Sequence, residues 1–403
     1  MATFEEARSA ILGRVAALGS EVVPALDAVG RVVAADVVSW RDQPAWDNSA
    51  MDGYAVRAAD TAHLSELRLA GYIPAGTSET QAVAPGTAAK ILTGAPMPAG
   101  ADAVVPVEEA EEREGRVVLQ RPVVAGAHVR HKGEDVRAGE PLLRAGMVTG
   151  PAELAALAGH GLLSVRVVRR PRVAILSTGD ELLEPGEPLS HGKIWNSNAI
   201  ALAGAVKLLG GVPSVLEIAR DEREPMRRLI SEGLRADVLL TSAGVSMGDR
   251  DLVRGVLEEL GVEQVFWKVE MKPGHPTAFA MHGRTPVFSL PGNPVSAMVA
   301  FGQLVRPALL KMMGHRKVLR PVTKAVLQHE VRRKPGRVQF LRVRLERLPD
   351  GTLAAGSAGR QDTWYLTTSL HSDGLAIIPA DQGAIPRGAI VDVEVTRPGF
   401  ELL

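Results

Sequence analysis

The chain has 403 residues, with 46 lysines and arginines balanced by 46 aspartates and glutamates, and no cysteine. This length predicts about two to four domains. The balanced charge disfavours a nucleic-acid partner, and the missing cysteines exclude disulfides, thiolate metal sites and cysteine nucleophiles. The sequence starts without a secretory pattern and holds no apolar run of the ~20 residues that span a membrane, so we expect a cytoplasmic protein with no membrane partner.

In chain order, apolar residues at helical spacing predict a helix over Phe4–Leu18. Short valine-rich runs separated by glycine and proline then predict a β-rich region from about residue 22 to 168. A helix is expected within it at Pro151–Gly159, since proline is favoured at the first helical position. The strands expected in this region are Ala88–Leu92, Ala103–Val107 and Val117–Leu119.

Three polar loops of the β-rich region are candidates for function. They contain Asp52, Thr93 and Asp135. Turn chemistry explains each of them without a ligand: Asp52 can fix a local turn by side-chain hydrogen bonds, and prolines and glycines stiffen the loop after Thr93. The alternative is that these side chains hold a metal or the polar edge of a ligand, and the residues alone leave both interpretations open.

From Pro171 to Gly314 the texture changes to α/β. Continuously apolar strands predict a parallel sheet covered by helices on both faces, and such sheets bind ligands beyond the carboxyl ends of their strands. A long apolar helix is expected at Val295–Leu310. The predicted strands, each followed by a polar loop, are Val173–Leu176, Asp237–Leu240 and Val287–Leu290.

The three polar loops are the strongest functional signal from the residues themselves. Their backbone amides, and the helix starts that follow two of them, suit a phosphate or another oxyanion. Asp249 and Asp251 bring carboxylates close to that anion, which implies a bridging divalent cation such as magnesium. The loop residues concerned are Glu181 in the first loop, Ser242, Gly244 and Ser246 in the second, and Pro291, Gly292, Asn293 and Ser296 in the third.

Two lysines precede the third loop. If residues 266–272 form one strand, Lys268, Glu270 and Lys272 share one face, and the two ammonium groups make a track for an anion. The alternative is an edge strand guarded by lysines. The stiff turn that follows holds His275 nearby. Beyond residue 320 the texture is β again, with strands expected at Gln339–Leu345, Leu375–Ile378 and Ile390–Val395.

Taken together, these motifs resemble one family, the molybdopterin molybdenumtransferases, which are the bacterial relatives of the gephyrin E domain. They occur in the family's order between Asp47 and Ala297. The matching stretches are NSAMDGYAV, TGAPMPAGADAVVPVE, KGED, STGDEL, GVSMGDRD, KPG and LPGNPVSAM.

The resemblance implies an elongated homodimer of four-domain subunits. Residues 1–20 and 171–318 would form an α/β domain like that of the molybdopterin adenylyltransferases, and residues 21–40 and 140–170 a connecting domain. Residues 41–139 would form a β-rich insertion, and residues 319–403 a C-terminal domain like a β-barrel. The active site would lie between the α/β domain of one subunit and the insertion of the other.

The resemblance also implies the reaction: molybdate is inserted into adenylated molybdopterin with release of AMP, in a magnesium-dependent step. Further partners would be the molybdopterin adenylyltransferase and recipient molybdoenzymes. Catalytic acids would be Asp52, Asp135, Glu181 and Asp251, of which Glu181 and Asp251 hold magnesium. Substrate contacts would be Thr93, Ser242, Gly244, Ser246, Lys268, Lys272, Pro291, Gly292 and Asn293, and molybdate contacts His275, Pro276, Ser296, Arg342 and Ser369.

The sequence departs from the family pattern at two of these loops. His275 stands where many relatives carry lysine or arginine, and Ala243 replaces a common glycine. Two alternative functions stay open: the adenylyltransferase step itself, and a non-catalytic scaffold like the gephyrin E domain.

Overall fold

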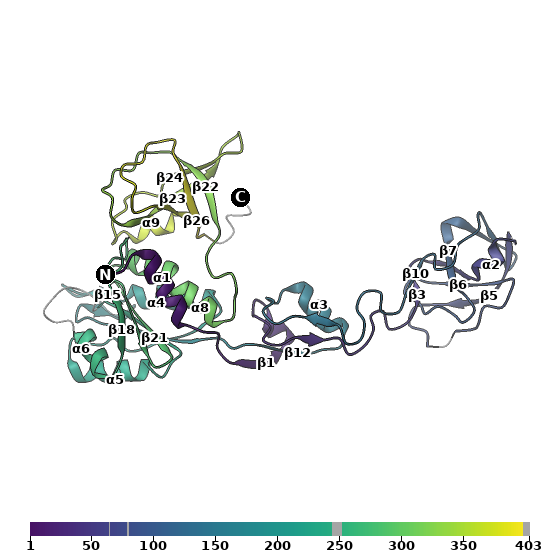
Figure 1. Ribbon diagram of the computed structural model, residues 1–403, viewed down its shortest axis with the longest axis horizontal. Coiled ribbons are helices and arrows are strands. Elements are labelled where there is room, and N and C mark those ends of the chain that lie inside the picture. Colours follow the sequence, from purple (N-terminus) through teal and green to yellow (C-terminus); the bar gives the residue numbers. More distant parts are fainter. Residues whose placement is uncertain (64, 79, 244–251, 398–403) are drawn as a thin grey trace. The chain divides into compact units, whose positions relative to one another are not determined.

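The structure, a computed structural model, describes residues 1–63, 65–78, 80–243 and 252–397 (Figure 1). Contacts within the chain divide it into two compact units. The first unit comprises residues 1–22, 30–34 and 166–403, and the second unit comprises residues 23–29 and 35–165. The four-domain division expected from the resemblance is finer than this and stays a prediction.

A six-stranded sheet forms the centre of the α/β part of the first unit, in the order β16-β13-β17-β21-β20-β18. Four neighbouring strands pair in parallel, as predicted, while β20 is antiparallel to both of its neighbours and is the one strand of this sheet that runs in the opposite direction. Only Gly283 and Arg284 separate β20 from β21, and such a short connection joins antiparallel strands only. The strands are β13 (Arg172–Ser177), β16 (Val212–Val215), β17 (Val238–Ser242), β18 (Glu263–Trp267), β20 (Ala278–His282) and β21 (Thr285–Leu290).

Both faces of this sheet are buried because successive side chains of a strand point to opposite faces. In β13, Val173 and Ile175 join a core cluster with α1, α4 and the α7–α8 stretch. Ala174 and Leu176 join a second cluster with α5 and α6. The helices are α1 (Phe4–Arg14), α4 (Ser197–Leu208), α5 (Arg223–Gly233), α6 (Leu252–Glu259), α7 (Pro294–Ala300) and α8 (Arg306–Met312).

The long apolar helix predicted after β21 is present, but its middle turn, η3 (Phe301–Val305), is a π-helix between α7 and α8. Pro307 explains the irregularity, since a proline cannot donate to the carbonyl of Gln303 four residues earlier and its ring crowds that carbonyl. The Gln303 side chain donates to Glu394 Oε2 at 2.7 Å.

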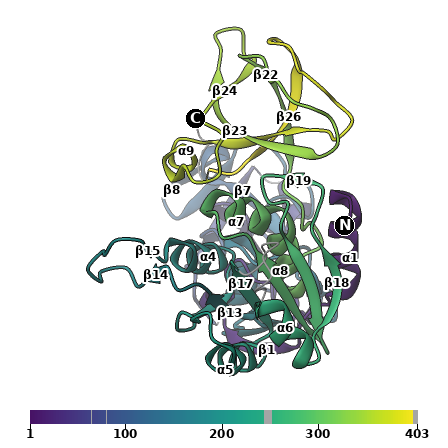
Figure 2. The same cartoon turned by 90° about the vertical axis from the view of Figure 1, so that its left-hand side faces the viewer.

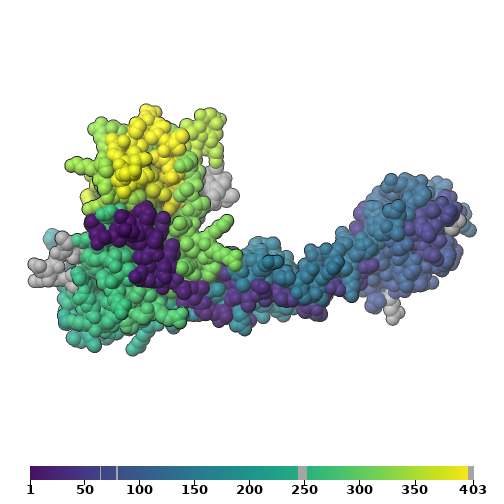
Figure 3. Space-filling view, in the orientation of Figure 1, coloured from purple at the N-terminus to yellow at the C-terminus, as the bar shows by residue number. Residues whose placement is uncertain are grey.

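Helix α1 begins at the predicted residue but ends at Arg14, four residues before the predicted end. Thr3 and Glu6 form a capping box at its start. The chain is extended at Val15, and the Leu18 amide donates instead to the Met312 carbonyl at 2.8 Å. Phe4 packs edge-to-face on Phe340 at 5.3 Å between ring centroids, and Figure 3 shows α1, in purple, against the yellow-green C-terminal part.

The C-terminal part of the first unit is a closed barrel of five strands, which confirms the barrel-like domain expected from the sequence. Its order is β23-β24-β22-β26-β25, and β25 closes the barrel by pairing with β23. A short strand from the α/β part, β19 (Met271–Lys272), pairs in parallel with the start of β23 (Figure 2). The barrel elements are β22 (Val322–Leu327), β23 (Val338–Arg347), β24 (Leu353–Ser357), α9 (Leu366–Leu370), β25 (Gly374–Ile378) and β26 (Ile390–Val395).

The second unit contains a six-stranded sheet in the order β7-β4-β6-β5-β9-β8. Helix α3 (Pro151–Gly159) has the predicted bounds. The strands of the sheet are β4 (Gly53–Val56), β5 (Glu66–Ile73), β6 (Thr87–Ile91), β7 (Ala103–Pro106), β8 (Ala110–Arg113) and β9 (Arg116–Leu119). Short pairs in this unit join β2 (Val37–Val38) to β11 (Pro141–Leu143) and β3 (Asn48–Ser49) to β10 (Val129–Arg130). Two further strands, β1 (Ser20–Pro24) and β12 (Ser164–Val168), pair with each other, and each has residues in both units.

Across the described ranges of the chain, none of the helices has both the length and the apolar character needed to cross a lipid bilayer.

Candidate functional site

A cleft of about 990 Å³ lies in the first unit, where β13, β17 and β21 end. Ser177 and Ser242 are the last residues of β13 and β17, and they are register partners. Because these strands are parallel neighbours, their three polar loops meet at one edge of the sheet. The predicted site residues that line the cleft are Glu181, Ser242, Lys268, Lys272, His275, Pro276, Pro291, Gly292, Asn293 and Ser296.

The start of α4 connects these loops. Asn198, in the first turn of α4, donates from Nδ2 to Ser242 Oγ and to the Gly292 carbonyl, both at 2.8 Å. Asn196 is the N-cap of the same helix and accepts from Ser177 Oγ at 2.9 Å. Sequence reasoning missed both residues, although an asparagine before an apolar helix is a recognisable N-cap signal.

Glu181 comes from the loop after β13. Its carboxylate lies so close to Gly179 that a Cβ built there would be 2.4 Å from Glu181 Oε2, and Gly179 has a positive φ of 139°. This backbone conformation favours glycine at position 179, because any other side chain would be strained there. Glu181 is exposed, so its oxygens are accessible to a ligand or a cation.

The two lysines of the cleft do not lie on one continuous strand, so that prediction is wrong. β18 ends at Trp267, and Lys268 has a left-handed φ of 72°. The strand is interrupted where the backbone of Ala2 forms two hydrogen bonds. The Ala2 amide donates to the Lys268 carbonyl at 3.2 Å, and the Ala2 carbonyl accepts from the Glu270 amide at 2.9 Å. Lys268 and Lys272 nevertheless both line the cleft.

His275 lies in the turn after Lys272, and a backbone carbonyl determines which of its ring nitrogens carries a hydrogen. Its Nδ1 lies 2.7 Å from the Val269 carbonyl. A carbonyl only accepts, so Nδ1 carries the hydrogen, and Nε2 can donate to an oxyanion only when the ring is cationic. Thr277 stabilises the turn by donating from Oγ1 to the Gly274 carbonyl at 2.6 Å.

The barrel contributes Arg337, Thr363 and Trp364 to the cleft, none of which sequence reasoning found. Thr363 contacts the start of α7 twice: its carbonyl accepts from the Val295 amide at 3.2 Å, and its Oγ1 accepts from Asn293 Nδ2 at 2.9 Å. No local pattern around residues 337 and 363 indicates a site, since only the docking of the barrel brings them there. With Arg337, the described lining has three lysine or arginine side chains and one carboxylate, Glu181.

Two residues predicted to bind molybdate lie elsewhere in the barrel. Arg342 is 2% exposed and does not line the cleft. Its guanidinium donates to Thr368 Oγ1 at 2.9 Å and to two backbone carbonyls of residues 360 and 362, and burial lowers its pKa. Ser369 is exposed on α9 and is also outside the cleft lining.

The predicted acids of the insertion lie in the second unit. Asp52 Oδ1 accepts from both the amide and the hydroxyl of Thr93 at 2.7 Å. These bonds, the amide first, lower the pKa of Asp52 and keep it ionised. Gly53 beside it has room for no side chain, because a Cβ would be 2.1 Å from the Val105 carbonyl oxygen. Asp135 is exposed, and its amide donates to the Gln43 carbonyl at 3.0 Å.

The remaining predicted residues, Gly244, Ser246, Asp249 and Asp251, fall outside the described residues. Elsewhere in the chain, within the described ranges, no three histidine, aspartate or glutamate side chains come together as a metal site. The single carboxylate of Glu181 is compatible with magnesium, because this ion is commonly bound by one or two carboxylates together with substrate phosphate oxygens.

The fold and the cleft define a class: multidomain proteins whose α/β domain carries a cleft with cationic side chains beyond its strand ends. Three protein-family models match the chain. They are the MoeA N-terminal region (domain I and II) over residues 2–161, the probable molybdopterin binding domain over residues 174–311, and the MoeA C-terminal region (domain IV) over residues 324–396.

Relatives match along almost the whole length. The chain is 37% identical to molybdopterin molybdenumtransferase 2 of Mycobacterium tuberculosis, over 92% of this chain and 94% of that protein. It is 33% identical to the molybdopterin molybdenumtransferase of Haemophilus influenzae, over 98% of both. A crystal structure of a molybdopterin biosynthesis MoeA protein from Pyrococcus horikoshii superposes with a TM-score of 0.84 at 33% identity, covering 98% of this chain and 99% of that one. The chain belongs to the molybdopterin molybdenumtransferase family and is an enzyme of molybdenum cofactor biosynthesis.

Proposed function

We propose that this enzyme inserts molybdate into adenylated molybdopterin with release of AMP, in the cytoplasm, and that it depends on magnesium. The observation that carries the proposal is the cleft itself: residues from three strand ends and three cationic side chains line it, in a chain of this family. Phosphate and molybdate are both tetrahedral oxyanions, so a surface of cations and hydroxyls suits both.

The side chains of the cleft act by binding and by stabilising charge. Lys268, Lys272 and Arg337 neutralise the anionic oxygens of the nucleotide phosphates and of molybdate. Asn198 holds the loops of Ser242 and Gly292 at a fixed separation, so that the reacting groups meet in one orientation. No residue of this set needs to form a covalent bond to the substrate.

Glu181 is the described side chain that would hold magnesium. Magnesium held there would supply Lewis-acid polarisation of the phosphoanhydride of the adenylated substrate. The exposed carboxylate beside Gly179 supports this assignment, since it leaves the remaining coordination positions to substrate oxygens and water.

Removing Lys272 tests the proposed insertion step. We expect Lys272→Ala to lower molybdate-dependent release of AMP by about 10²–10³-fold, because one preorganised charge contact is lost. Lys324→Ala is the matched control, since Lys324 pairs with Asp392 on the barrel and is outside the cleft lining. Equal turnover of both variants would refute the assigned role of the cleft.

We further propose that the site is shared between two subunits of a homodimer, with Asp52, Thr93 and Asp135 of one subunit completing the cleft of its partner. The ionised, exposed carboxylate of Asp52 supports this role. Mixing inactive Asp52→Ala and Glu181→Ala subunits tests it, because a mixed dimer would contain one intact site. Random mixing should restore about a quarter of wild-type activity, whereas a site made within one subunit would restore none.

The adenylyltransferase alternative makes a different prediction. Incubation with molybdopterin and ATP in the absence of molybdate would then give adenylated product. A purely scaffolding protein would release no AMP under any of these conditions.

A further inference from the structure

Two tryptophans of the cleft are largely exposed. Trp195 is 46% exposed and Trp364 is 61% exposed, and both line the cleft. They come from different parts of the first unit: Trp195 ends β15 (Ile194–Trp195) beside α4, and Trp364 precedes α9 on the barrel (Figure 2). An exposed indole gives up the burial that normally stabilises so large an aromatic side chain, so a pair of them around one cleft calls for a ligand.

Each indole is held in place by its own neighbours. Trp195 Nε1 donates to the Glu187 carbonyl at 2.9 Å, and Trp195 pairs with Leu183 of β14 (Leu182–Leu183). The Trp364 ring lies 5.7 Å from the ring of Tyr365, which in turn carries the Arg360 guanidinium 4.8 Å above it. Both rings are therefore fixed on one side while much of their surface stays open to the cleft.

The surroundings define the chemistry of what would bind there. Aromatic faces attract flat ring systems, and the cations Lys268, Lys272 and Arg337 in the same cleft attract anions. A ligand that satisfies both is an anion attached to a flat nitrogen heterocycle.

We propose that Trp195 and Trp364 are stacking platforms for the heterocyclic rings of the substrate. The inference rests on the function proposed above, because adenylated molybdopterin carries two such rings, adenine and pterin, joined by phosphates. The platforms position the rings of the substrate, and the cations that line the same cleft hold the phosphates. The two tryptophans thereby determine specificity, since they select a flat ring at the end of an anionic chain.

The experiment compares two ring probes. AMP and free pterin are titrated separately into the purified full-length enzyme without molybdate, and binding is measured by calorimetry. Stacking on an aromatic side chain is worth enough that Trp195→Ala or Trp364→Ala should weaken one probe by about 5-fold to 150-fold. The probe that is weakened by each variant tells which ring that tryptophan holds.

Conservative and remote variants serve as controls. Trp195→Phe and Trp364→Phe keep an aromatic face and should restore most of the affinity. Trp40→Ala should change neither probe, because Trp40 is 66% exposed in the second unit and is not part of the cleft lining. Binding of both probes unchanged in both alanine variants, or no binding of either ring to the wild type, would overturn the proposal.

A turnover measurement separates this inference from the proposed function. With adenylated molybdopterin as substrate, loss of a platform should raise KM and leave kcat close to that of the wild type. If the wild type stacks the rings but inserts no molybdenum, the proposed function fails and the platforms stand. If insertion proceeds normally in both alanine variants, the platforms fail and the function stands.

Discussion

One amide group, on Asn198, donates to both Ser242 Oγ and the Gly292 carbonyl at 2.8 Å. Asn198→Ala removes both bonds and leaves those acceptors unpaired, so we expect the free energy of unfolding to fall by about 1–3 kcal/mol. Chemical denaturation measures the change. Asn198→Asp keeps the size but cannot donate from its side chain, and it should destabilise at least as much. If Asn198→Asp were as stable as the wild type, the shape of this side chain and not its donated hydrogen bonds would matter.

Ala243 has a left-handed φ of 74°, the region that favours glycine. A side chain in that conformation costs about 1–2 kcal/mol, whereas glycine loses more freedom on folding by roughly 0.5–1 kcal/mol. Ala243→Gly should therefore raise the free energy of unfolding by up to about 1.5 kcal/mol. The matched variant Ala201→Gly, inside α4, should lower it by about 1 kcal/mol. A loss of stability in both variants would contradict the assigned strain.

Among the individual site residues, those that belong to continuous sequence motifs could be predicted. Gly292 was found because the loop after an apolar strand has a recognisable composition and position, and Lys272 and His275 because they belong to the short motif around the Lys-Pro-Gly turn. Trp364 was missed, because its place at the cleft depends on how the barrel docks, and that information is spread over many weakly patterned residues.

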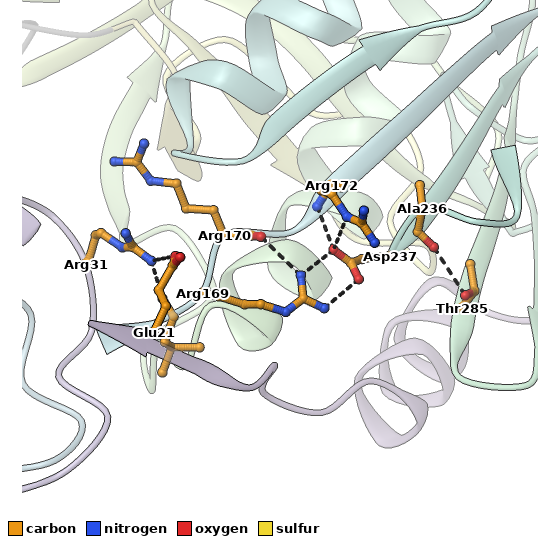
Figure 4. A network of polar contacts seen from close by, with 9 residues as sticks. Glu21, Arg31, Arg169, Arg170, Arg172, Ala236, Asp237 and Thr285 are labelled. Carbon is orange, nitrogen blue, oxygen red and sulfur yellow. Dashed lines mark hydrogen bonds and ion pairs between the residues drawn. The ribbon is translucent and has the colours of Figure 1, made fainter. Parts of the chain in front are cut away.

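At the level of elements, the starts of β13 and β17 are joined by Asp237 (Figure 4). Its two oxygens accept from Arg169 Nη1 and Nη2 at 2.6 Å, and one also accepts from the Arg172 amide at 2.8 Å. Burial alone would raise the pKa of Asp237, but the bonds from Arg169 and Arg172 outweigh burial and the pKa lies below its usual value.

This arrangement predicts a dependence of stability on pH. The stabilisation from the Asp237 carboxylate is fully present above about pH 4, where the unfolded chain is also ionised, and it is lost as the pH falls through the lower folded pKa. Asp237→Asn should lower the free energy of unfolding at pH 7 by about 1–3 kcal/mol, and its stability should decline less between pH 7 and the acid limit. Denaturation at several pH values measures both.

The control for this prediction is Glu217→Gln. Glu217 pairs with Arg228 on the surface, where ion pairs contribute little. We expect both its stability and the pH profile to match those of the wild type. If the stability of Asp237→Asn fell with decreasing pH as steeply as that of the wild type, the role of the carboxylate would be contradicted.

The elements that could be predicted are those whose hydrophobic period is regular. The apolar strands and α3 appear at the predicted positions, and the π-helical turn and the interrupted strand at Lys268 do not follow from period alone. Both irregularities arise from partners remote in the sequence or from the missing proline amide, which a periodic pattern does not encode.

At the scale of the whole molecule, each unit has its own hydrophobic core. Leu67 is fully buried in the second unit, and Leu202 is fully buried in the first. Separate cores predict two calorimetric transitions instead of one. Leu67→Ala and Leu202→Ala should each destabilise by about 2–5 kcal/mol and lower the Tm of only one transition, a different one in each variant. A shift of both transitions by either variant would indicate a single cooperative unit.

The contact between α1 and α8 joins parts of the chain that are synthesised far apart in time. Lys311 Nζ donates to the Leu12 carbonyl at 2.5 Å, across 299 residues. At about 5–20 residues per second, α1 leaves the ribosome roughly 15–60 s before this partner exists. All residues of the second unit are synthesised within that interval. The second unit can therefore fold while the apolar side chains of α1 are still exposed to solvent. Nascent chains of this enzyme should accordingly recruit chaperones to their first helix.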